Sequence, residues 1–281
     1  TSNFGFTFDQ ISACLRVALI SPAMQVRAAC FRAFRHLLID AESLKIFLQQ
    51  RLDIFIIRTL DTLAKKDDSE RVQALRLIRK IVYLCPESFP ISLGMSLAAI
   101  CCDMSAEKDH MSRPCLATLC ELAVSNIAVA SYCGVVHAVI LNTLDCTFPR
   151  MNEALISTVL FLLNHPHYRC YVRKNYGLEA VLAPFTDIYY RYNAEIPENL
   201  LKDDQINRMS SASLALIAII KSWSGFIYIC NPECNTIETL FGVFRLPHTE
   251  IRKVMIDMFF EIFCLCKPVW TNHFTEALLS V

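Results

Sequence analysis

Residues 24–38 read MQVRAACFRAFRHLL, and this stretch decides the fold. Its apolar side chains recur at the i, i+3, i+4, i+7 spacing that places them on one face of an α-helix. Arg32 and Arg35 project from another side of the same helix. The positions of the apolar face are Val26, Ala29, Cys30, Ala33, Phe34 and Leu37. The stretch therefore predicts an amphipathic helix with one side to bury.

The same six-position pattern returns four more times along the chain. Counted by its first position, it begins at Val26, Arg71, Ser112, Met151 and Ile251, in steps of 45, 41, 39 and 100 residues. The last step leaves room for one more unit near Ile206–Ile220 and an insertion. Further helical patterns lie at 52–63, 89–101 and 135–144. A period of about 40–47 residues with two or three helices is typical of armadillo and HEAT repeats.

A helical pair of this kind cannot bury its apolar face alone, so successive units stack and share a continuous core. We therefore predict an all-α protein, a right-handed armadillo/HEAT-like α-solenoid in which residues 1–281 form a single helical-repeat domain. The polar, acidic segment from Tyr189 to Asp204 is expected to be a surface loop that interrupts the stack. An irregular all-helical globule is the alternative.

The composition agrees with packed helices and excludes several function classes. Apolar residues make up 54% of the 281 residues and charged residues only 19%. There are six glycines, and no two are close in sequence. A Walker loop, a dinucleotide-binding fingerprint and a nucleophile elbow all need closely spaced glycines, so the sequence argues against all three. It also argues against a turn-rich all-β fold.

The charge balance gives a second exclusion. Lys and Arg number 27, as do Asp and Glu, so the net charge is zero. A general nucleic-acid-binding protein usually carries a basic excess, and we expect no nucleic-acid partner. Residues 1–90 are nevertheless mildly basic, with 13 basic against 9 acidic residues.

The sequence predicts a cytoplasmic protein with no membrane span. Residues 1–4 lack the basic start and apolar run of a signal peptide. The apolar run from Leu214 to Ile220 is seven residues long, whereas a membrane span needs about twenty. The 14 cysteines are accordingly expected to be reduced thiols, buried as small apolar side chains.

No motif predicts a catalytic, cofactor or metal site. Zinc sites usually use C-x-x-C spacing and four ligands, and the cysteine pairs here have other spacings. His165-Pro166-His167 looks more like a helix end than a ligand cluster. The groups considered are Cys264 with Cys266, Cys230 with Cys234, His165 and His167 with Cys170, and Asp257 with Glu261. A metal- or cysteine-dependent enzyme stays as a remote alternative.

Four basic residues are the best candidates for binding a partner. Arg32 and Arg35 project from one predicted helix, and Arg76 and Lys80 from the equivalent helix of the next unit. Stacked repeats would place them along one continuous surface, which is how solenoids build extended binding sites. An acidic protein segment is the expected partner. The alternative is ordinary solvated charge, paired with neighbours such as Asp68 and Glu70.

Several stretches strongly resemble one known family, in order and across nearly the whole chain. They are QVRAACFRAFRHLL (25–38), ERVQALRLIRKI (70–81), MNEALISTVLFLLNHPHYRCYVR (151–173), LAPFTDIYYRY (182–192), KSWSGFIYIC (221–230), EIRKVMIDMFFEIF (250–263) and EALLSV (276–281). On these residues the chain resembles the N-terminal armadillo region of the Rictor family, the rapamycin-insensitive companions of the TOR kinase. The most specific block runs from Asn152 to Pro166.

This resemblance implies a non-enzymatic scaffold and the N-terminal piece of a longer protein. Members of the family define the second TOR complex and dock the TOR kinase, a Sin-type adaptor and other TOR complex subunits. That complex phosphorylates AGC-family kinases such as Akt in growth, survival and cytoskeletal signalling. The family's nucleotide-binding patch and zinc-binding end have no matching residues here. An adaptor or small-GTPase regulator outside TOR signalling is the alternative function.

Overall fold

The computed structural model describes residues 5–62, 68–102, 109–144, 149–173, 202–230, 236–245 and 249–265. Within these ranges the chain is all α-helical, with 15 α-helices, two short 3-10 helices and no strand. The all-α prediction is therefore confirmed. None of the helices in these ranges is both long and apolar enough to cross a membrane.

The helices divide into two compact units, residues 1–138 and 139–281. The first unit holds α1 to α8 and the start of α9 (Val135–Leu144). Its bounds are α1 Phe8–Ala18, α2 Met24–Leu37, α3 Ala41–Gln49, α4 Asp53–Asp61, α5 Ser69–Leu84, η1 Pro86–Ser88, α6 Ile91–Cys102, α7 Ser112–Ser125 and α8 Ile127–Tyr132.

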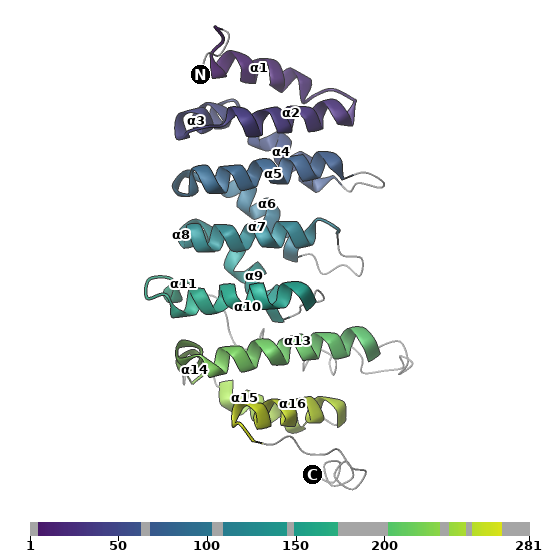
Figure 1. Cartoon of the computed structure of the whole chain (residues 1–281), viewed down its shortest axis with the longest axis vertical. Coiled ribbons are helices and arrows are strands. Elements are labelled where there is room, and N and C mark those ends of the chain that lie inside the picture. Colours follow the sequence, from purple (N-terminus) through teal and green to yellow (C-terminus); the bar gives the residue numbers. More distant parts are fainter. Residues whose placement is uncertain are drawn as a thin grey trace. The chain divides into compact units, whose positions relative to one another are not determined.

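The first unit is built from two columns of helices. In one column α2 packs on α5 and α5 packs on α7, and in Figure 1 these three helices form successive rows. In the other column α4 packs on α6, and each of these also contacts its long neighbour, α5 or α7. The core of the unit includes Phe34 of α2 and Phe47 of α3, which are fully buried and meet edge to face with ring centroids 5.2 Å apart.

The second unit repeats the long-helix column. Its helices are α10 Pro149–Asn164, α11 Arg169–Arg173, α13 Lys202–Lys221, α14 Trp223–Ile229, α15 Thr236–Gly242, η3 Val243–Arg245 and α16 Thr249–Ile262. Here α10 packs on α13 and α13 packs on α16, while α14 lies against both α10 and α13. Most of the predicted loop lies outside the described residues, and its last three residues, 202–204, belong to α13.

All six predicted repeat units contain a long helix. In two of them, α2 and α10, the residues that are buried lie one position away from those that the sequence pattern placed on the buried face. Val26 is 41% exposed and Ala29 is also exposed, although both were placed on the buried face. The buried residues of α2 are Cys30, Phe31 and Phe34, followed by Leu38 just after the helix. Their equivalents in α5 are Ala74, Leu75, Ile78 and Val82. The first step is therefore 44 residues (30 to 74, 34 to 78), not 45.

Of the next two steps along the chain, the first keeps its predicted length and the second is corrected by one residue. The step from α5 to α7 stays at 41 residues, because Ala74 and Ile78 correspond to Cys115 and Leu119. The next step is 40 residues, since Leu155 and Val159 are the buried equivalents in α10, and Ala154 is exposed. The sequence pattern was ambiguous because neighbouring small residues such as Ala28 and Ala29 fit a helix face in two adjacent registers.

We predict that Gly94→Ala destabilises the first unit. Gly94 lies in α6 where that helix meets α8, and an added Cβ would lie 2.7 Å from the Sγ of Cys133. Overpacking of this kind costs about 1–3 kcal/mol, more than the helix propensity gained by alanine. The free energy of unfolding from urea titration, followed by circular dichroism, measures the loss. Gly242→Ala is the control, because an added Cβ there meets nothing within 4 Å. Equal effects of the two substitutions would contradict the prediction.

Candidate functional site

Arginines of the long helices in the first unit bind carboxylates in, or just before, the next long helix. We call each long helix with its short neighbours a layer. The Nε and Nη2 atoms of Arg27 in α2 donate to the two carboxylate oxygens of Glu70 in α5, at 2.9 and 2.6 Å. Glu70 is 9% exposed and also accepts a hydrogen bond of 2.9 Å from the Oγ1 of Thr59 in α4. Because this bidentate pair is largely shielded from water, it joins α2, α4 and α5 in one fixed register.

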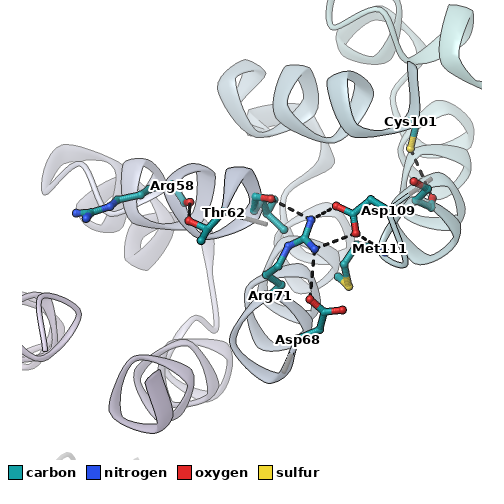
Figure 2. A network of polar contacts seen from close by, with 9 residues as sticks. Arg58, Thr62, Asp68, Arg71, Cys101, Asp109 and Met111 are labelled. Atoms are coloured by element: carbon teal, nitrogen blue, oxygen red, sulfur yellow. Dashed lines mark hydrogen bonds and ion pairs between the residues drawn. The ribbon is translucent and has the colours of Figure 1, made fainter. Parts of the chain in front are cut away.

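The next layer is joined by what we call the Arg71 cluster, defined as Arg71, Asp68, Asp109 and the carbonyl of Leu60 (Figure 2). The side chain of Arg71 is 5% exposed. Its Nη1 and Nη2 donate to the two carboxylate oxygens of Asp109, just before α7, and Nη1 also reaches Asp68 at 3.3 Å. Nη2 donates to the carbonyl of Leu60, near the end of α4, at 3.1 Å. The cluster thus ties α4 and α5 to the start of α7.

Charge and hydrogen bonding explain how Arg71 occupies a buried helix position. An isolated buried guanidinium would be strongly unfavourable, and two carboxylates with one carbonyl offset its loss of hydration. In return, the guanidinium of Arg71 holds the pKa of the Asp109 carboxyl below its usual range, against the opposing effect of burial. Asp109 also accepts a hydrogen bond of 2.9 Å from the backbone N–H of Met111.

A third interlayer pair lies on the outer side of the long-helix column. Arg79 in α5 donates through Nε, at 3.0 Å, and through Nη2 to the carboxylate of Glu121 in α7. Their side chains are 52% and 45% exposed. Pairs of such exposure contribute little to stability. The pair nevertheless neutralises the charge of Arg79 on the exposed side of α5.

The four basic residues predicted for partner binding form what we call the basic face: Arg32, Arg35, Arg76 and Lys80. Arg32 and Arg76 are exposed, and Arg35 and Lys80 are half-buried. With the corrected step of 44 residues, Arg32 and Arg76 occupy equivalent positions in α2 and α5, which pack against each other. Asp68 and Glu70, the neighbours considered in the alternative of ordinary solvated charge, bind Arg71 and Arg27 instead.

Within the described residues, none of the basic face forms an ion pair. Lys80 instead places its Nζ 6.0 Å from the ring centroid of Tyr83, one turn further along α5. Tyr83 is 84% exposed. The geometry therefore leaves two exposed cations, two half-buried cations and one exposed aromatic ring on two adjacent helices.

The remaining candidates are separated or only partly described. His165 directly follows the end of α10, in agreement with the helix-end interpretation, and the Sγ of Cys170 contacts the carbonyl of His167 at 3.2 Å. Glu261 pairs with Lys221 of α13 at 3.8 Å. Cys234 and Cys266 lie outside the described residues. Among the residues that are described, no group of three His, Cys, Asp or Glu side chains is arranged to hold a metal ion.

The thiols of the core behave as apolar side chains. Cys30, Cys85, Cys101, Cys115 and Cys133 are buried, as predicted, whereas Cys14, Cys170, Cys230 and Cys264 are exposed. Burial raises the pKa of the Cys115 thiol to about 12. The same cause raises the pKa of Cys30 and Cys133. At neutral pH these buried thiols stay protonated and therefore unreactive.

The interlayer pairs were missed at the sequence level, although two signals pointed to them. Arg71 interrupts an apolar helix face, and a buried basic residue requires an acidic partner. The paired residues are also separated by close to one repeat, with 43 residues between Arg27 and Glu70, 38 between Arg71 and Asp109, and 42 between Arg79 and Glu121.

Comparison with known proteins gives one consistent family. The family model described as "Rapamycin-insensitive companion of mTOR, N-term" matches residues 2–279. The chain is 42% identical over 277 residues to "Rapamycin-insensitive companion of mTOR" of Mus musculus and equally to that of Homo sapiens, covering 99% of this chain and 16% of each relative. It is 25% identical over 255 residues to "Target of rapamycin complex 2 subunit ste20" of Schizosaccharomyces pombe, covering 89% of this chain and 19% of that protein.

We predict that Asp109→Asn lowers the free energy of unfolding by about 3 kcal/mol at pH 7, because it leaves Arg71 buried with less compensation. Since the folded-state pKa of Asp109 is depressed, its stabilising contribution is present above the unfolded pKa of about 3.9 and is lost as pH falls through the folded value. Urea titrations at pH 7 and pH 3 should therefore show a smaller acid-induced loss in the variant than in the wild type.

The matched control is Glu121→Gln, which removes the half-exposed pair with Arg79. We expect it to cost less than about 1 kcal/mol at pH 7. If the two substitutions cost the same, burial does not distinguish the Arg71 cluster from a surface pair.

Proposed function

The chain belongs to the family of the N-terminal region of Rictor, the rapamycin-insensitive companion of mTOR, and on this basis we propose that it is part of a non-catalytic scaffold subunit of the second TOR complex. It spans 16% of the length of the mammalian relatives that it matches. The fission yeast relative is named as a subunit of target of rapamycin complex 2. In this role the protein docks the TOR kinase and a Sin-type adaptor in the cytoplasm. It thereby supports phosphorylation of AGC kinases such as Akt.

The proposed architecture is a right-handed armadillo/HEAT-like solenoid in which residues 1–281 form a single domain. Its support is the order of the helices. The long helices α5, α7 and α10 each follow two shorter helical segments, which is the three-helix order of an armadillo repeat. The preceding segments are α3 with α4, η1 with α6, and α8 with α9, whereas α16 follows three, α14, α15 and η3. Stacked repeats present extended surfaces suited to holding several partners at once.

The basic face is the observation that favours docking at α2 and α5. Of the cations on these two helices, Arg27, Arg71 and Arg79 have acidic partners, whereas the four of the basic face pair with no acidic side chain in the part of the chain that the structure describes. Unneutralised cations on a surface attract complementary acidic surfaces and fix the register of the complex. Arginine is also suited to this task, because its planar guanidinium binds carboxylates in a bidentate manner.

We predict that Arg76→Glu with Lys80→Glu, introduced into the full-length protein, reduces co-purification of the TOR kinase or the Sin-type adaptor at least fivefold. Reversing two charges turns attraction into repulsion while the buried face of α5 stays intact. Affinity purification followed by quantitative mass spectrometry gives the measurement.

The matched control is Lys45→Glu with Arg58→Glu, which makes the same change at exposed positions of α3 and α4. In Figure 2 the side chain of Arg58 points away from the Arg71 cluster. Undiminished recovery of both partners by the first variant would refute docking at the basic face. Recovery of small-GTPase pathway proteins without any TOR kinase, by the wild type, would refute the TOR scaffold itself.

A further inference from the structure

We propose that the basic face binds an extended acidic protein segment that crosses α2 and α5 and presents carboxylates three residues apart; this rests on the docking role proposed above. The argument starts from charge. Together α2 and α5 carry seven arginines and lysines and a single carboxylate, Glu70. That carboxylate is buried and bonded to Arg27 and Thr59, so neither helix offers an exposed acidic group.

Three of the seven cations are already neutralised. Arg27, Arg71 and Arg79 form the interlayer ion pairs, and the four that remain are the basic face. The ligand that complements this surface is therefore anionic and has at least two separate negative charges. On the α7 side Arg79 is already paired with Glu121, so the unpaired cations of the binding strip lie on α2 and α5.

Repeat geometry determines the spacing of those charges. Arg32 and Arg76 are equivalent residues on two packed helices, and Arg35 is the equivalent of Arg79. Packed helices have axes about 8–10 Å apart. A segment in the extended polyproline II conformation advances about 3.1 Å per residue with three residues per turn, so carboxylates at positions n and n+3 lie on one face, about 9 Å apart. An extended segment with this spacing brings one carboxylate to Arg32 and the next to Arg76.

The distribution of the cations favours a segment that crosses the helices over one that lies along them. A partner helix parallel to α5 would meet Arg76 and Lys80, which are four residues apart, and would leave Arg32 and Arg35 without a partner. A crossing segment meets cations on both helices. The exposed ring of Tyr83 beside Lys80 adds an apolar surface at the end of α5 for a neighbouring side chain of the segment.

Fluorescence anisotropy with the purified full-length protein and labelled 12-residue peptides tests this proposal. One peptide repeats Glu-Thr-Ser four times. A second has the same composition with its four glutamates in one block, and a third is an alanine-rich helix former with glutamate at every fourth residue. We expect the first to bind at least fivefold more tightly than either of the others near 0.15 M salt, and to weaken as salt rises.

Arg32→Gln with Arg76→Gln should reduce binding of the first peptide at least fivefold, whereas Lys45→Gln with Arg58→Gln should leave it unchanged. Equal binding of the first two peptides would overturn the three-residue spacing, and tighter binding of the helical peptide would overturn the crossing geometry. If no peptide binds but charge reversal still reduces recovery of the TOR kinase, this inference fails while the proposed function stands. If peptides bind as expected but that recovery is unaffected, the acidic-segment site stands and the docking role fails.

Discussion

Each helical layer of the first unit depends on the next for the partners of its polar groups. Seven residue pairs that are hydrogen-bonded between layers are separated by 38–43 residues, which is close to one repeat. They include the amide of Asn126 with the carbonyl of Pro86, and Ser92 with Asp53. Five of the pairs are partly buried, and because buried polar groups are generally hydrogen-bonded, these five constrain adjacent layers to one register. Apolar burial alone would tolerate small shifts between neighbouring helices.

This constraint explains the buried arginine of α5. Arg71 stands at a position where α7 has Ser112 and α10 has Asn152, both also buried and polar. An arginine reaches further than either, and its guanidinium bonds two carboxylates and a carbonyl from three segments of the chain. The carboxylates that neutralise it are thereby withdrawn from the surface.

The exposed side of α2 and α5 keeps positive charge, although the whole chain is neutral. This is because Glu70 and Asp109 bind Arg27 and Arg71 in the interlayer pairs, and Glu121 binds Arg79. Burial of acidic partners and exposure of basic residues are thus two results of one packing arrangement. In the proposed scaffold role, a stable register would hold the cations at a constant spacing for a partner.

Helical periodicity and the 40-residue recurrence in the sequence were sufficient to predict an all-α chain, the positions of its long helices and the exposure of Arg32 and Arg76. Local spacing determines these features, because apolar residues on one face of a helix are recognisable without its neighbours. The exact register was not predictable, since Val26 and Ala29 fit the pattern as well as the buried Phe31 and Leu38. The partners of Arg27, Arg71 and Arg79 depend on which residues of the next layer lie opposite them. Only tertiary packing decides this, because it joins residues about one repeat apart and so determines which cations remain free for a partner.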